Sequence, residues 1–284
     1  MTTDSQAKPV TAAEVAEQAV EDFVSFYNPA AGFQLRLGFS GTTLARCVGI
    51  GPSGGIVMSN DFKSQPVESL KDLAFVLLIL GHEVAHYVHL HNAAEQLPSV
   101  DDRSLEDWAD FYGAKVMMTL TTCGTKLGPL FQRLRGTVSN DEVYIEIGNA
   151  LAKLAESVYP TTSSSYSTPL TRVGHCVCGI LSFVDAMSGM KNLDRSIAIQ
   201  QLLYRNDFLK RLISEQGQAY MQDDAPARSL AIHRGLQPTS AGITPGLRPE
   251  FERFLRTCFD NDDDRITRNS EAALAELVRQ GLEV

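Results

Sequence analysis

The sequence predicts an α+β fold, in which a small antiparallel sheet packs on one apolar helix and the C-terminal half is mostly helical. Residues 33–60 contain short alternating or apolar runs separated by glycine-rich turns, a pattern typical of about three short strands. Residues 69–92 follow as one long expected helix that contains the apolar run 73–80. The helical period then recurs through most of the chain beyond residue 104.

Residues at the helix starts support this order of elements. Thr11 is of a type that caps helix N-termini, and it predicts a helix over 11–28. Ser69, with Asp72 three residues later, predicts the start of the helix over 69–92. The other expected helices begin near residue 104 and cover 139–158, 170–189, 195–218 and 225–234, before a Pro- and Gly-rich break at 237–249 and two short helices.

The length of the chain, 284 residues, allows one large domain with an appendage. We expect a disordered tail at residues 1–10, a core at 11–190 and a helical C-terminal subdomain at 191–284. The sequence does not indicate the oligomeric state.

Charge and cysteine content limit the partners and the compartment. The net charge of −9 argues against nucleic-acid binding, which needs a clustered basic face. Five scattered cysteines and a polar N-terminus without signal-peptide features favour a reduced, cytoplasmic setting. The apolar runs 73–80 and 173–187 are too short or too interrupted to span a bilayer, and we expect both to be buried core helices.

The chemistry of the chain is concentrated in His82-Glu83-Val84-Ala85-His86. Residues four apart share one face of a helix, so both imidazoles can reach one cation. Zinc needs a further protein ligand, and Glu106 on the next expected helix supplies one, with Asp110 on the same face. Asp107 competes by proximity, but it points about 100° away from Glu106 on a helix.

A resemblance to a known family rests on GHEVAHYVHLH at 81–91, on the Glu106-x-x-x-Asp110 pair, and on Phe-Tyr-Gly-Ala at 111–114. These motifs resemble the gluzincin zinc metallopeptidases, and among them the HtpX and CAAX prenyl-protease type. The resemblance implies a zincin-like core with Zn²⁺ bound by His82, His86 and Glu106. It also implies Glu83 as the general base and Asp110 as the carboxylate that orients a ligand histidine.

Two histidines follow the motif closely. His89 returns to the face of His82 and His86, but it lies about 4.5 Å further along the helix axis than His86, which argues against a shared ion. His91 matches a histidine that often follows the motif in the resembled family. For both residues we expect a polar role at the helix end rather than catalysis.

Peptide hydrolysis also needs a donor for the oxyanion. Tyr166, His175 and His233 are candidates, and the sequence does not rank them. Arg172 ends a Pro-x-x-Arg stretch, Pro169 to Arg172, similar to one in the same family, with Thr168 where that family often has a histidine. Arg172 is expected either to brace the ligand glutamate or to bind substrate, against the alternative of an ordinary surface arginine.

The function that these motifs predict is zinc-dependent hydrolysis of a peptide or protein substrate, with an extended substrate lying antiparallel to the strand near residues 54–59. A second reading is a regulatory or phage-defence peptidase that cleaves one cellular protein. A third is a non-catalytic zinc protein, which would have no need of Glu83 as a base. In a fourth, the motif is accidental and the chain is a helical interaction module.

Overall fold

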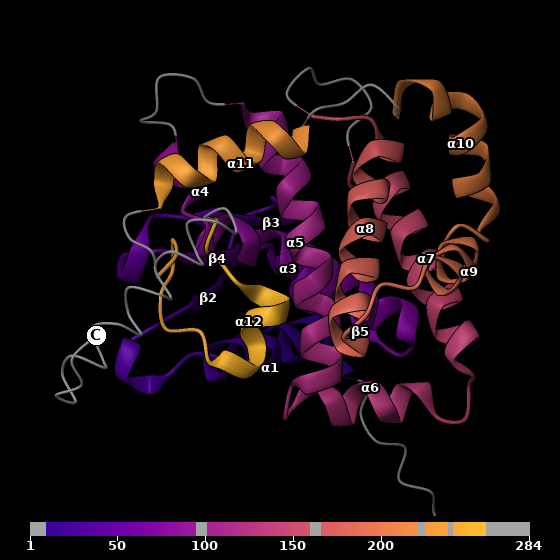
Figure 1. Cartoon of the computed structure of the whole chain (residues 1–284). Coiled ribbons are helices and arrows are strands. Elements are labelled where there is room, and N and C mark those ends of the chain that lie inside the picture. The colour runs from indigo at the N-terminus through magenta and orange to yellow at the C-terminus, as the bar shows by residue number, and fades with distance from the viewer. Residues whose placement is uncertain (1–9, 95–100, 160–165, 221–224, 238–240, 260–284) are drawn as a thin grey trace, which may run out of the picture.

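Two long helices, α3 (Leu70–Val88) and α5 (Asp102–Cys123), form the centre of the fold in the computed structural model (Figure 1). The structure describes residues 10–94, 101–159, 166–220, 225–237 and 241–259. Across the described residues the fold is α+β, about 68% helical with a small sheet, as the sequence predicts at this level. Residues 1–9 of the expected tail and residues 260–284 lie outside the described residues.

The close crossing of α3 and α5 depends on two glycines. A Cβ added to Gly113 would lie 2.6 Å from the backbone nitrogen of His82, and one added to Gly81 would meet the carbonyl oxygen of Gly113. Side chains at these positions would force the backbones apart. Because the helices touch here, side chains from the first turns of α5 reach His82 directly.

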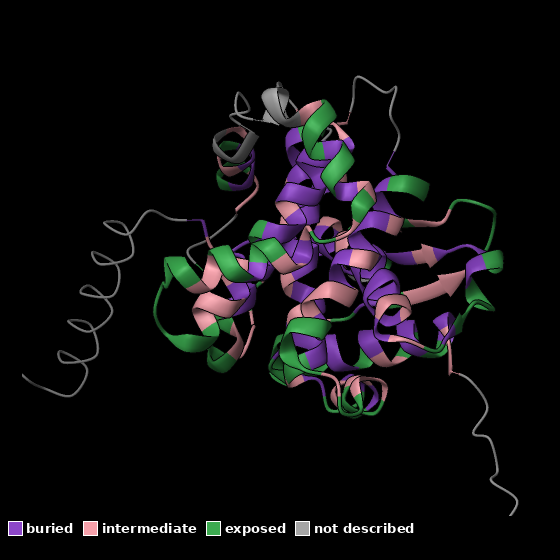
Figure 2. Ribbon diagram, turned by 90° about the vertical axis from the view of Figure 1, so that its right-hand side faces the viewer, coloured by how far each residue is buried: buried purple, intermediate pink, exposed green. Residues whose placement is uncertain are grey.

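The remaining helices surround this pair. They are α1 (Ala12–Ser25), α2 (Asn60–Lys63), α4 (His91–Ala94), α6 (Leu127–Arg135), α7 (Asn140–Ser157), α8 (Pro169–Ser188), α9 (Leu193–Leu203), α10 (Asp207–Tyr220), α11 (Ala225–Leu236) and α12 (Pro249–Leu255), with short 3₁₀ turns at Pro29–Ala31 and Gly51–Ser53. Helix α7 packs on α3, α8 packs on α5, and α9 and α10 lie outside them (Figure 1). Figure 2 shows the buried residues gathered along the central helices.

The sheet corrects one prediction, because it is mixed rather than antiparallel. Strand β4 (Gly55–Met58) is central, with β2 (Arg36–Phe39) parallel on one side and β3 (Ala45–Val48) antiparallel on the other. A six-residue connection that includes the 3₁₀ turn Gly51–Ser53 joins β3 to β4, whereas β2 follows α1 and runs in the same direction as β4. A second, two-stranded sheet pairs β1 (Val10–Thr11) with β5 (Pro66–Val67), and the sequence patterns did not indicate it.

Helix starts follow local signals. The Thr11 side chain caps α1 in a capping box with Glu14, and the Ser69 hydroxyl accepts the N–H of Asp72 at 3.1 Å at the start of α3. The single helix predicted over 195–218 is wrong: α9 ends and α10 begins around Asn206. The Asn206 side chain accepts the N–H of Phe208 at 2.9 Å, a turn that competes with continued helix.

Helix α8 is long and apolar enough to cross a bilayer by length and composition, although 56% of its most apolar window is buried inside the fold. Core helices of soluble proteins pass the same test. Helix α8 packs along α5, and the buried Arg172 lies in its first turn. The absence of a membrane span therefore stays a prediction.

The C-terminal helices each contact the core. Helix α11 packs on α4 and α5, α12 packs on α5 and α8, and the backbone of Leu247 forms an isolated bridge with Tyr27 after α1. The Tyr112 hydroxyl, on α5, donates to the carbonyl of Leu255 at 2.6 Å. These contacts bring part of the segment 191–284 to the same helices that carry the site.

Candidate metal centre

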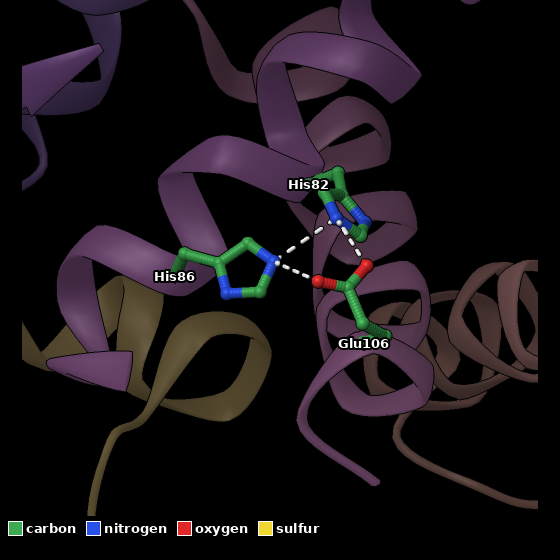
Figure 3. Close-up of side chains that lie close together, drawn as sticks. All are labelled: His82, His86 and Glu106. Atoms are coloured by element: carbon green, nitrogen blue, oxygen red, sulfur yellow. Dashed lines mark hydrogen bonds and ion pairs between the residues drawn. The ribbon is translucent and has the colours of Figure 1, made fainter. Parts of the chain in front are cut away.

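Three side chains converge between α3 and α5 (Figure 3). His82 and His86 are one turn apart on α3, and their Nε2 atoms are 3.0 Å from each other. Glu106, from the start of α5, places Oε2 at 3.2 Å from His82 Nε2 and Oε1 at 3.4 Å from His86 Nε2. The ligand atoms of all three lie within 4.8 Å of one another.

A carboxylate contacts the Nδ1 atom of His82. Its Nδ1–H donates to Asp110 Oδ1 at 2.9 Å, and the Tyr159 hydroxyl donates to the same oxygen at 3.1 Å. Arg172, buried with 4% of its surface exposed, donates from Nε to Asp110 Oδ2 at 2.6 Å. The Arg172 Nη2 also lies 3.3 Å from Glu106 Oε2. This geometry fits the brace that the sequence suggested for Arg172 and excludes an exposed surface position.

Another histidine, His91, contacts the Nδ1 atom of His86. The Nδ1 atoms of His86 and His91 are 2.8 Å apart, and His91 Nε2 is 2.8 Å from His233 Nε2. The Nδ1 atoms of both candidate ligands are thus engaged by partners behind them. Both Nε2 atoms are left facing Glu106.

Burial and charge shift the pKa values of the two imidazoles in opposite directions. Burial lowers the pKa of His82, but Glu106 and Asp110 outweigh it and raise that pKa to about 10. Burial and the charge of His82 lower the pKa of His86 to about 4. Burial acts to raise the pKa of Glu106, yet His82, His86 and Arg172 hold it at about 2. Glu106 is therefore ionised at neutral pH.

Glu83 faces the edge of the sheet. The backbone N–H of Cys47, in β3, is directed toward the Glu83 carboxylate and acts to lower its pKa. Burial raises the pKa of Glu83, and the charge of His82 opposes part of that rise. A carboxyl group with a raised pKa beside a cation site is suited to accept and return a proton.

A cleft of about 510 Å³ runs past these residues. One turn of α3 before His82, Leu78 and Ile79 line the cleft together with Leu154 and Val158 from the end of α7. The rest of the wall includes Glu83, all three candidate ligands, Tyr166 and the strand β3. The cleft therefore places an apolar surface next to the polar cluster, as small-ligand and peptide sites commonly do.

Some predicted residues lie away from this cluster. The Asp107 carboxylate accepts from the Ser167 hydroxyl at 2.7 Å and lies 3.7 Å from His175 Nε2, on another side of α5. His233 is fully buried against His91. Of the three oxyanion candidates, Tyr166 is the one that the structure brings to the cleft.

His89 is the C-cap of α3, a helix-end position as predicted, and it is fully buried. Its Nδ1–H donates to the carbonyl of Ala85 at 2.9 Å, and its Nε2 accepts from Trp108 at 3.4 Å. His91 differs from the expectation, because its ring contacts His86 rather than only closing a helix end.

Sequence reasoning missed several neighbours of the site. Tyr159 follows α7, and its position beside Asp110 depends on how α7 packs on α3. Asn92, in α4, donates to the carbonyl of Gly49, just after β3, at 3.0 Å, and Cys47, in β3, faces Glu83. Burial raises the pKa of Cys47 to about 12, which keeps it a thiol. For these residues the one sequence signal was their proximity to the motif or to the expected strands.

The donor set fits a zinc ion. Two imidazole nitrogens and one carboxylate, with a position left open, are a ligand set of catalytic zinc sites. The nitrogens behind both imidazoles have hydrogen-bond partners, as is usual for metal-bound histidines. The half-buried carboxylate of Glu106 and the buried one of Asp110 share the guanidinium of Arg172, and a bound cation would take the place of the proton that His82 otherwise carries.

Comparison with protein-family models, with curated proteins and with solved structures finds no match for this chain.

Proposed function

We propose that the chain is a zinc-dependent metallopeptidase of the gluzincin kind, with a zincin-like arrangement of its active-site helix and sheet. The observation that carries the proposal is the convergence of His82, His86 and Glu106 beside Glu83, in a cleft bordered by a strand edge. A zinc ion that serves only as a structural staple would gain nothing from Glu83 at this place.

Each group of residues at the site has a separate role in the proposed hydrolysis. His82, His86 and Glu106 would hold zinc, which when bound supplies the Lewis acidity that activates water and polarises a carbonyl group. Glu83 accepts the proton of the attacking water and passes it to the leaving amine. Tyr166, at the cleft wall with Arg172 5.2 Å from its ring centre, is the candidate donor to the oxyanion.

Substrate is proposed to dock on β3, not on the strand near residues 54–59 as the sequence suggested. Strand β4 has neighbours on both sides, whereas β3 is an edge strand that lines the cleft. The N–H of Cys47 points to Glu83 and its carbonyl lies 3.4 Å from Asn92 Nδ2, so both face away from β4. Since residues two apart on a strand share an orientation, the N–H and C=O of Ala45 face the same free edge.

The metal content of four proteins expressed identically tests the proposal. Wild type and Glu83→Gln should each carry close to one zinc per chain by elemental analysis, and Glu106→Ala should lose most of it. Glu17→Ala, at an exposed position on α1, is the matched control. On a library of unfolded proteins, Glu83→Gln should cleave about 10²–10⁴-fold more slowly than wild type. A zinc-free wild type, or a fully active Glu83→Gln, would refute the assignment.

The docking strand has its own test. Ala45→Pro removes one edge N–H without touching the candidate ligands, and Ala45→Ser keeps it. We expect Ala45→Pro to lower kcat/KM for peptides on the order of 10-fold, which corresponds to one net hydrogen bond. Its zinc content should stay at the wild-type level. Equal kcat/KM for the two variants would place the substrate elsewhere.

A further inference from the structure

A row of three imidazoles runs from the candidate metal site into the interior. His86 Nδ1 is 2.8 Å from His91 Nδ1, and His91 Nε2 is 2.8 Å from His233 Nε2. His91 and His233 are buried, with 5% and 0% of their surfaces exposed. At the far end, His233 Nδ1 is buried and has no hydrogen-bond partner among the described residues.

The chain adopts a strained turn to make the first of these contacts. Leu90 has a φ of 55°, and it is the one residue other than glycine in the left-handed region among those that the structure describes. This turn ends α3 after its C-cap, His89, and starts α4 at His91, whose ring folds back on His86. Left-handed backbone at a bulky residue persists where the surrounding structure requires it, and such strain is common near functional sites.

The second contact comes from the C-terminal part of the chain. His233 lies on α11, which packs on α4 and α5 (Figure 1). Its ring stacks on Phe259, with centroids 4.5 Å apart and planes 22° apart, and it also contacts Trp108. These rings fix the imidazole of His233 in one orientation and exclude water from it.

The hydrogen bonds of the row can run in only two directions. A neutral imidazole has one N–H donor and one acceptor nitrogen, so a ring that accepts a hydrogen bond at one nitrogen donates from the other. His91 and His233 are buried, and burial favours the neutral form of an imidazole. If His86 turns a bare Nε2 toward the metal, its proton is on Nδ1. His91 then accepts at Nδ1 and donates from Nε2, and His233 accepts at Nε2.

We propose that His91 and His233 are positioning residues, and that the row His86–His91–His233 holds His86 in the tautomer whose Nε2 lone pair faces the metal. The inference rests on the proposed metal site and extends it to α11. Metal-bound histidines usually donate to a carboxylate, a carbonyl or water. Here the neutral imidazole of His91 takes that place, and His233 in turn orients His91.

Zinc affinity, measured by competition with a chromogenic chelator, tests the row without relying on activity. Loss of a hydrogen-bond partner behind a ligand typically weakens metal binding about 10–100-fold, and we expect His91→Phe to fall in this range. His233→Phe keeps the aromatic packing and removes the acceptor for His91, so its loss should lie toward the lower limit of about 10-fold. His233→Gln restores an acceptor near the position of Nε2 and should recover most of the affinity.

His89→Phe is the matched control, because His89 is equally buried among the same rings and its ring nitrogens form hydrogen bonds with Ala85 and Trp108. It should lose thermal stability comparably to His233→Phe and keep its zinc affinity. Nitrogen-15 spectra of zinc-loaded wild type add a reading that needs no variant. They should show the proton of His86 on Nδ1, that of His91 on Nε2, and that of His233 on Nδ1.

The outcomes separate the two levels of the argument. Wild type that binds no zinc refutes the metal site itself. Wild type that binds zinc, with His233→Phe matching its affinity or with His233→Gln losing as much as His233→Phe, refutes the row and leaves the site standing. Spectra with the His86 proton on Nε2 in the zinc-loaded protein refute the row as well.

Discussion

The two histidines of the candidate metal site lie one turn apart on the same helix, yet they are held by different chemistry. Behind His82 is the charged Asp110, itself bonded to Arg172 and Tyr159. Behind His86 is the neutral imidazole of His91. The pKa of His82 is raised to about 10 and that of His86 is lowered to about 4.

This difference shows that orientation and basicity can be supplied separately. Asp110 orients His82 and also raises its basicity, so that a proton competes with the metal for Nε2. His91 orients His86 without adding charge, and burial with the charge of His82 keeps the pKa of His86 low, so this imidazole would carry no competing proton at neutral pH. A second carboxylate behind His86 would add another buried negative charge, which would need a cation to balance it. Arg172 already pairs with two carboxylates, those of Glu106 and Asp110.

The largest expected effect comes from breaking the charged side. Asp110→Asn keeps the shape of the side chain and removes the charge that pairs with the buried Arg172. Breaking a buried ion pair by removing one partner costs about 3–5 kcal/mol of unfolding free energy, and Glu106 compensates in part. Chemical denaturation of the metal-free protein measures this loss.

His91→Phe provides the comparison for that measurement. It removes hydrogen bonds and no charge, so its cost should be about 1–3 kcal/mol, the range for leaving buried polar groups unpaired. Equal losses in Asp110→Asn and His91→Phe would contradict the distinction between a charged and a neutral support.

Local signals explain which parts of the fold were predictable. The caps at Thr11 and Ser69 act within three residues of their own helix, and both starts were predicted. Helix α6 was missed because its cap comes from far away: the buried Asp22, on α1, accepts the N–H groups of Lys126 and Leu127 at 3.1 and 2.9 Å. The mixed sheet was missed for a similar reason, since β2 pairs with β4, and β3 lies between these two strands in the sequence but not in the sheet.

The residues of the site also differ in whether a local sequence pattern predicts them. His82, Glu83 and His86 are visible as a helical spacing, and Glu106 and Asp110 as a second one, because each set lies on one helix face. Tyr159 and His233 carry no such period, and they reach the site through packing of α7 and α11. His91 was considered and assigned to a helix end, since its return to His86 depends on the left-handed turn at Leu90.

The smallest effect, and the most direct measure of the comparison, is the pH dependence of zinc affinity. With the pKa of His82 at about 10 and that of His86 at about 4, the metal-free site carries one proton on its two imidazoles between pH 5 and 7. Zinc must displace that proton, so its affinity should rise with pH, by about tenfold per unit. Below about pH 4 a second proton, on His86, should double the slope.

Calorimetric titration of zinc in buffers of different ionisation enthalpy checks this dependence by counting the protons released. Near pH 6 the count from the two imidazoles should be one. Asp110→Asn should lower the pKa of His82, because it removes one of the charges that hold the proton there, and the slope above the new pKa should flatten. His91→Phe should weaken binding and leave the slope unchanged, since His91 carries no charge in this range. A wild-type affinity that is constant from pH 5 to 7 would mean that His82 is as free of protons as His86, and that the two supports are electrostatically equivalent.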